Sequence, residues 1–102
     1  MAEPKIRICT DVNGMWVRQL LFEQVGDTHR GHYHSEDHAT LLTYGSLSIN
    51  VDGVGHTYTA PHIIVITKGK RHDLTALEPG TLAYCVAPVA DVPTFYPPKE
   101  TT

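Results

Sequence analysis

Seven histidines occur in this chain of 102 residues, and four of them fall within ten residues. In an extended strand, side chains two residues apart share a face and lie about 7 Å apart, so His32 and His34 can converge on one ion. His38 has the same parity, although the three residues before it can bend the chain. His72 is a fourth candidate, because a hairpin or a barrel can bring it beside the other three. Imidazoles at this spacing indicate a metal site, and a polar surface loop is the alternative.

Strands must position these histidines, because β-rich runs separated by turn dipeptides fill most of the sequence. The runs that we predict to be strands are Lys5–Cys9, Met15–Glu23, His38–Thr43, Ser46–Val51, His62–Thr67, Arg71–Leu77 and Thr81–Ala87. A helix over 16–24 is the alternative for the second run, but it would be short and would lack an N-terminal cap. The succession of short strands and turns is typical of an all-β sandwich or barrel.

Three local patterns refine this interpretation. Ser46–Val51 alternates between polar and apolar residues, which predicts one buried face and one wetter face. His62–Thr67 is almost continuously apolar, and this predicts a strand buried on both faces. The dipeptide Asn13-Gly14 predicts a type I′ hairpin, since both residues tolerate a positive φ. We expect one domain over residues 1–102, with an N-terminal strand at 5–9, a barrel over about 12–88 and a proline-rich tail at 91–102.

Composition argues against several classes of function. The formal net charge is -3 and the 8 Lys and Arg residues are scattered, so we expect neither nucleic acid nor a membrane surface as a partner. No stretch approaches the ~20 apolar residues that a membrane-spanning helix needs. We expect no secretory signal, because the first residues include an acid and a proline and lead into no apolar segment. Cys9 and Cys85 are far apart and form no CxxC motif, which is typical of a protein of the reducing cytoplasm.

The histidine-rich segment resembles the first motif of the cupin superfamily, G(X)5HXH(X)3–4E(X)6G. Gly26, His32, His34 and Gly45 stand at the spacing of that motif. His38 occupies the position where the family usually has glutamate. This substitution is the one departure of the segment from the motif.

A later segment resembles the second cupin motif, G(X)5PXG(X)2H(X)3N, in part. Gly69 and His72 are in place, whereas the motif's first glycine, its proline and its asparagine are replaced by Pro61, Thr67 and Ala76. The resemblance covers about residues 12–88 of the chain. It implies a small cupin barrel (a double-stranded β-helix, or jelly roll) with one mononuclear metal site. It also implies a homodimer, because small single-domain cupins often pair.

The resemblance implies that His32, His34, His38 and His72 are the ligands of one divalent transition metal. Imidazole suits several metals, so Fe, Mn, Cu, Ni and Zn are all candidates. Four neutral imidazoles leave the charge of the ion uncompensated, and this favours anionic or enolate ligands. Glu36 is the alternative ligand if a bend before His38 shifts the register.

An octahedral ion held by four histidines has two open positions, which favours an enzyme. We expect a metalloenzyme that acts on a small molecule by oxidative, dioxygenase-like chemistry. One alternative is a Lewis-acid isomerase, cyclase or lyase, and another is a non-catalytic module that binds a small molecule or a metal. A fold of this kind does not distinguish these functions by itself.

Specificity must come from the side chains that line the barrel. Three residues of the following strand share the parity of His38, and we expect them to point inward: Thr40, Leu42 and Tyr44. Of Tyr84 and Cys85, which are neighbours in the last strand, only one can point inward.

No residue of the motif acts as a general base. The candidates are Tyr44, Glu36 and Asp73, and none of them is placed by the resemblance. This favours chemistry carried out by the metal itself.

Two further histidines are assigned no role in the site. His29 has the opposite parity to the motif histidines, and we expect it in a loop. We expect His56 to face solvent.

Overall fold

The computed structural model describes residues 2–31 and 37–88, and within this part it does not describe the side chains of residues 8–12. The described chain forms β-strands and turns and contains no helix. The strands in these ranges are β1 (Lys5–Val12), β2 (Met15–Phe22), β3 (Thr28–His29), β4 (His38–Tyr44), β5 (Ser46–Val51), β6 (Val54–Thr59), β7 (His62–Ile66), β8 (His72–Ala76) and β9 (Thr81–Pro88). The described ranges therefore include no helix that is long and apolar enough to cross a membrane.

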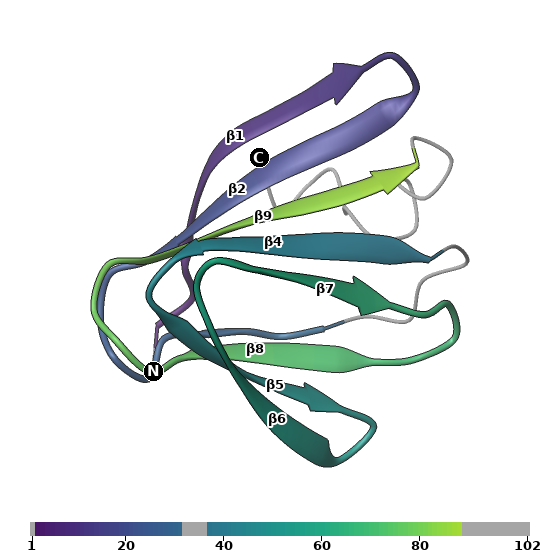
Figure 1. The fold of residues 1–102 in the computed structure, drawn as a ribbon. Coiled ribbons are helices and arrows are strands. Elements are labelled where there is room, and N and C mark those ends of the chain that lie inside the picture. Colours follow the sequence, from purple (N-terminus) through teal and green to yellow (C-terminus); the bar gives the residue numbers. More distant parts are fainter. Residues whose placement is uncertain (1, 32–36, 89–102) are drawn as a thin grey trace.

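The strands form two antiparallel sheets that face each other (Figure 1). The first sheet has five strands in the order β1-β2-β9-β4-β7, and the second has four in the order β3-β8-β5-β6. Strands that follow one another in sequence often lie in different sheets, as β4 and β5 do, so the chain winds around the core. This confirms the prediction of an all-β jelly-roll barrel.

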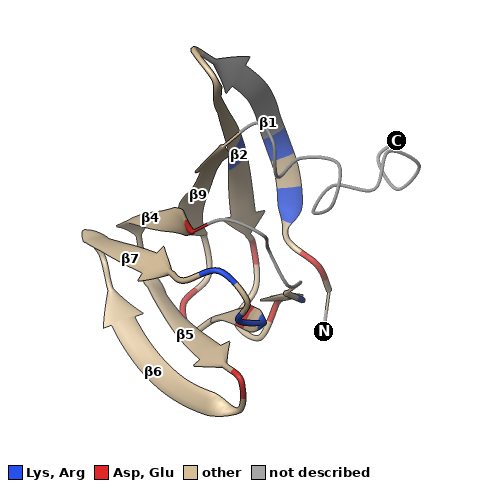
Figure 2. Cartoon of the chain, turned by 90° about the vertical axis from the view of Figure 1, so that its right-hand side faces the viewer, with Lys and Arg blue, Asp and Glu red and all other residues tan. Residues whose placement is uncertain are grey.

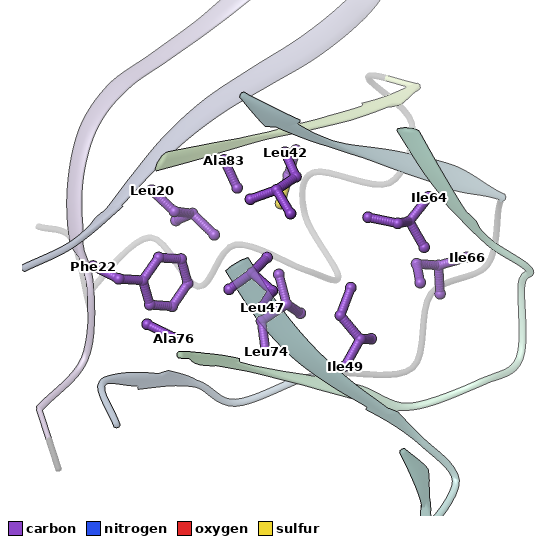
Figure 3. Close-up of a cluster of buried hydrophobic side chains, with 11 residues drawn as sticks. Leu20, Phe22, Leu42, Leu47, Ile49, Ile64, Ile66, Leu74, Ala76 and Ala83 are labelled. Carbon is purple, nitrogen blue, oxygen red and sulfur yellow. The ribbon is translucent and has the colours of Figure 1, made fainter. Parts of the chain in front are cut away.

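Alternating side chains fill the space between the two sheets. In β2, β8 and β9 every second residue is buried, as the period of a strand requires. The apolar cluster that results contains Leu20, Phe22, Leu42, Leu47, Ile49, Ile64, Ile66, Leu74, Ala76, Ala83 and Cys85. Figure 3 shows these side chains pointing from both sheets toward a common centre. Burial of this cluster is the main source of stability, at roughly 25 cal/mol per Å² of apolar surface.

Two hairpins have the turn that the sequence favours. β1 and β2 are joined by Asn13 and Gly14, whose φ angles are 51° and 82°. β5 and β6 are joined by Asp52 and Gly53, with φ angles of 49° and 88°. Positive φ at both central residues is the signature of a type I′ turn, so the prediction for the first hairpin is confirmed.

The prediction that β7 is buried on both faces is wrong. Ile64 and Ile66 are buried, but Ile63 is 67% exposed and Val65 is 65% exposed. β7 is the last strand of its sheet, and its outer side faces solvent in the single chain.

Two strands, β3 and β6, were not predicted. β3 is short and β6 is polar, so neither has a run of apolar or β-branched residues long enough to indicate a strand.

Gly45 is the single residue between β4 and β5, where the chain passes from one sheet to the other. Its φ is 87°, a region that L-residues with a side chain rarely adopt. A Cβ at this position would lie 2.3 Å from Thr81 Oγ1 and 2.9 Å from Thr81 Cα. The passage between the sheets therefore requires glycine both for its backbone angle and for its close approach to β9.

Substitution of Gly45 by alanine tests this close approach. We expect Gly45→Ala to lower the free energy of unfolding, measured by urea denaturation, by ~1–3 kcal/mol more than Gly53→Ala. Gly53 is a matched control, because its φ is 88° and a Cβ added there would have no neighbouring atom within 4 Å. Equal losses in the two variants would show that the backbone angle alone, and not the contact with Thr81, requires glycine at position 45.

Candidate metal centre

Two of the four predicted ligands, His38 and His72, meet in the barrel interior. His38 begins β4 of the five-stranded sheet, and His72 begins β8 of the four-stranded sheet. Both side chains are buried, their Nε2 atoms are 3.2 Å apart and their ring centroids are 4.7 Å apart. The two rings are tilted by 42° and so do not stack face to face. The contact joins the two sheets across the core.

Strand register directs both rings inward. His72 is in phase with buried Leu74 and Ala76 and pairs with Val51 of β5. His38 is in phase with buried Thr40. Because the first residue of each strand has the same parity as the buried residues behind it, both imidazoles point between the sheets.

Gly31, the last described residue before the segment 32–36, lies directly against His72. A Cβ on Gly31 would be 1.3 Å from the His72 carbonyl oxygen, so no side chain fits there. The Gly31 N–H donates a hydrogen bond of 2.7 Å to Asp73 Oδ1. On the other side of the segment, Asp37 Oδ1 accepts a hydrogen bond of 2.8 Å from the Lys68 N–H. Both ends of the segment are thus anchored next to the strands that carry His38 and His72.

The other predicted ligands, His32 and His34, lie outside the described residues, and so does Glu36. In residues 2–31 and 37–88 there is no group of three or more His, Cys, Asp or Glu side chains that could hold a metal. The described part of the centre is therefore the pair His38 and His72. Two imidazole nitrogens suit zinc, copper, iron or nickel, and they fit a metal as part of a larger ligand set.

A second polar contact between the sheets, that of Arg18 with His29, was not predicted from the sequence. Arg18 of β2 is 1% exposed, and its Nη2 lies 2.9 Å from Nε2 of His29. A guanidinium has no acceptor, so Arg18 donates and His29 accepts through Nε2. The guanidinium carbon of Arg18 also lies 5.0 Å from the ring centre of Trp16, a cation–π contact.

The expectation of a loop at His29 is wrong, because His29 belongs to β3 and is buried. Its Nδ1 lies 3.7 Å from Glu3 Oε1, on the side away from Arg18. The strand is only two residues long, and such a short element leaves no periodic signal. Arg18 could have been found, because it alternates in phase with Trp16 and Leu20.

Of the neighbouring residues Tyr84 and Cys85, it is Cys85 that points inward. In the five-stranded sheet it is paired with Arg18 on one side and Thr40 on the other, and its Sγ lies 3.8 Å from Thr40 Oγ1. Burial raises the pKa of the Cys85 thiol, while the charge of Arg18 and the hydrogen bond with Thr40 act in the opposite direction. Tyr84 points outward, where its hydroxyl accepts a hydrogen bond of 2.6 Å from Gln19 Nε2.

The structure places two candidate bases away from the histidine pair. Tyr44 is 61% exposed, and the expectation that it lines the interior is wrong. The register of β4 against β9 shifts between Leu42 and Tyr44, which breaks the alternation just before the strand ends. Asp73 has the opposite parity to His72, and it accepts from Gly31 and lies 3.6 Å from Arg71 on the outer face. Thr40 and Leu42 are buried as predicted.

Two further histidines lie on the surface. His56 and His62 are exposed, and His62 contacts the ring of Tyr58 at a centroid distance of 4.9 Å. The prediction that His56 faces solvent is confirmed.

Comparison with solved structures shows the fold. The chain is similar to KdgF from Halomonas sp., with a TM-score of 0.69 and 18% identity over 79% of this chain and 75% of that one. It is similar to a cupin-2 domain protein from Shewanella frigidimarina, with a TM-score of 0.68 and 21% identity over 86% and 83% of the two chains. An RmlC-like cupin with a double-stranded β-helix from Methanocaldococcus jannaschii matches with a TM-score of 0.72 and 10% identity over 100% and 89%. By sequence, the chain matches no family model and no curated protein.

The buried thiol of Cys85 gives a pH-dependent prediction. Below pH 9.0, the usual pKa of a cysteine, the thiol is protonated in the folded and the unfolded chain. Above pH 9.0 the unfolded chain releases this proton while the folded chain retains it, so the free energy of unfolding falls as the pH rises. We expect this alkaline fall, measured by urea denaturation at several pH values, to be smaller in Cys85→Ala.

Labelling provides a second measurement of the same burial. In a Cys9→Ser background, a thiol reagent should modify Cys85 slowly in the folded protein and rapidly in denaturant. Rapid labelling under native conditions would contradict the burial of this side chain.

Proposed function

We propose that this protein, whose fold is that of the small cupins, binds one divalent transition metal inside the barrel and acts there on a small anionic molecule. The observation that carries the proposal is the distance of 3.2 Å between Nε2 of His38 and Nε2 of His72. Two imidazole nitrogens that bind one ion at ~2.1 Å, with an angle of about 100° between them, are ~3.2 Å apart. The same distance also allows one ring to donate a hydrogen bond to the other, and the experiment below separates the two cases.

His32 and His34 complete the ligand set in this proposal. Support comes from the ends of the segment that contains them. Gly31, which directly precedes His32, touches the backbone of His72. At the other end, only Asp37 separates the segment 32–36 from His38. A chain that begins and ends beside the pair is well placed to add ligands to it.

The charge of the interior supports an anionic substrate. A set of four imidazoles carries no negative charge, so the charge of the ion stays uncompensated. Arg18 adds a permanent positive charge that is buried in the same interior, on the strand two places away from β4. A carboxylate or enolate is the class of small molecule that such a site attracts. In this proposal Arg18 orients the anionic group, and Leu42, Ile64 and Ile66 keep water from the reacting atoms.

The proposed reaction is oxidative and dioxygenase-like. Tyr44 and Asp73, the two candidate bases within the described residues, both face away from the histidine pair, and this favours chemistry centred on the metal. Bound iron, manganese or copper would supply redox chemistry with dioxygen, whereas zinc or nickel would supply Lewis-acid polarisation. A Lewis-acid isomerase, cyclase or lyase is therefore the alternative, together with a module that binds a small molecule without converting it.

Metal content tests the centre. Protein purified without an affinity tag should carry close to one equivalent of transition metal by elemental analysis. We expect His38→Ala and His72→Ala to weaken metal affinity by more than the ~10–100-fold typical of an outer-shell change, because each removes a direct ligand. His56→Ala is the matched control, since His56 is exposed on β6, and it should retain the metal. Undiminished metal in both interior variants would assign the contact of 3.2 Å to a hydrogen bond.

Oxygen uptake tests the reaction. Metal-loaded protein should consume dioxygen with at least one anionic member of a panel of β-diketones, thiols and phenols. Arg18→Gln should raise KM for that compound more than it lowers kcat, because the guanidinium binds the anionic group and not the metal. Tight metal binding without turnover across the panel would favour the binding module. Conversion without oxygen uptake would favour the Lewis-acid alternative.

A further inference from the structure

The outer side of the four-stranded sheet carries a cavity that the proposed function does not use. Asp73 and Thr75 of β8 and Asn50 of β5 have the opposite parity to the buried residues of their strands, so they point away from the barrel interior. The cavity beside them has a volume of about 470 Å³, within the ~300–1,000 Å³ typical of small-molecule sites. The described residues of its lining are all polar or charged: Glu3, Thr28, Arg30, Asn50, Asp73 and Thr75.

A second cavity continues the first along the same side of the sheet. It has a volume of about 340 Å³, and its described lining is Asn50, Asp52, Gly53, Arg71 and Asp73. Asn50 and Asp73, which pair across β5 and β8, line both cavities. The two cavities therefore form one polar groove, which we call the outer groove. Figure 2 shows acidic and basic residues close together between the N-terminus and the turn that joins β5 and β6.

The N-terminal segment forms one wall of the outer groove. The Thr28 N–H donates a hydrogen bond of 2.9 Å to the Ala2 carbonyl oxygen, so this segment runs beside β3 and brings Glu3 to the groove. The Thr28 hydroxyl donates its proton to the Gly26 carbonyl oxygen. It therefore accepts from the Thr75 hydroxyl, 3.0 Å away, and the Thr75 oxygen keeps lone pairs that can accept from a ligand.

Backbone groups hold three of the polar side chains in place. Asn50, Asp52 and Asp73 each use Oδ1 to accept one hydrogen bond, at 2.8, 3.1 and 2.7 Å. The donors are, in the same order, the backbone N–H groups of Gly53, Arg71 and Gly31. Among residues 2–31 and 37–88, the second polar atom of these three side chains has no partner. Each side chain is thus fixed by one atom and offers the other to a ligand, which lowers the entropy cost of binding.

The charges of the outer groove nearly cancel. Its described lining holds three carboxylates and two guanidinium groups: Glu3, Asp52, Asp73, Arg30 and Arg71. The carboxylates in both cavities oppose a phosphate or another small anion, and the guanidinium group in each opposes a cation. A neutral hydroxyl group can donate to a carboxylate and accept from a guanidinium, in charge-assisted hydrogen bonds. The groove therefore suits a neutral molecule with several hydroxyl groups.

We propose that the outer groove binds a neutral saccharide of two rings, with one ring in each cavity. Asp73 and Asn50, which line both cavities, contact both rings. The site lies on the opposite side of β5 and β8 from the candidate metal centre, so binding requires neither the metal nor the interior histidines. We expect a dissociation constant on the order of 1 mM, because an open polar groove buries little apolar surface.

An NMR titration of the isotope-labelled full chain tests the outer groove. At least one sugar among maltose, cellobiose and lactose should shift the backbone amide signals of Asn50, Gly53 and Asp73. Arg30→Gln should raise the dissociation constant of that sugar by roughly ten-fold or more, because it removes a charged donor. Arg7→Gln is the matched control, since Arg7 is exposed on β1 of the other sheet, and it should bind like the wild type. Both arginines are exposed, so both variants should fold.

A second variant tests the assignment of one ring to each cavity. Asp52→Asn keeps an acceptor for the Arg71 N–H and tolerates the φ of 49° at this position, but it removes a charge from the smaller cavity. It should weaken binding of the disaccharide several-fold. Binding of glucose, which fills only the larger cavity, should be unchanged. Equal losses for glucose and the disaccharide would contradict this assignment.

Other outcomes would overturn the proposal as a whole. It fails if none of the three sugars shifts the amide signals of the groove, or if Arg30→Gln binds the sugar as tightly as the wild type does. Inorganic phosphate and glycine serve as competing probes in the same titration. A tighter response to phosphate would assign the outer groove to an anion, and a tighter response to glycine would assign it to a zwitterion.

Discussion

The two-residue period of the strands is the constraint on which the rest of this structure depends. Because every strand lies in one of two facing sheets, alternate side chains point either between the sheets or away from them. In β2 this places Trp16, Arg18, Leu20 and Phe22 inside, and their neighbours outside. A shift of one residue in pairing would turn the buried set outward. The registers of the two sheets thus decide which residues pack in the core and which polar groups meet there.

In the described part of the chain, two pairs of long polar side chains join the sheets across that interior. Arg18 and His29 join β2 to β3, while His38 and His72 join β4 to β8. Polar and charged groups are costly to bury unless they find hydrogen-bond partners or a ligand. The apolar cluster between the sheets supplies the stability that offsets this cost (Figure 3). The interior therefore contains two kinds of contact: an apolar cluster that holds the sheets together, and buried polar side chains where we propose that an ion and an anionic molecule bind.

The two faces of the five-stranded sheet differ in the polarity of their side chains. Its inner face contributes His38, Thr40, Cys85 and Arg18 to the polar interior, whereas the outward side chains of β2, β9, β4 and β7 are uncharged and largely apolar.

Local patterns in the sequence determined most strand positions, the Asn13-Gly14 hairpin, the all-β barrel and the inward parity of Thr40 and Leu42, because these follow from propensity and period within a few residues. The contact of His72 with His38 across 34 positions, and that of Arg18 with His29, were decided only by the tertiary structure. The same holds for the outward turn of Tyr44 at a register shift. Periodicity tells which face of its own strand a residue occupies. It does not tell which strand of the opposite sheet lies across from it, since that is set by how the two sheets pack.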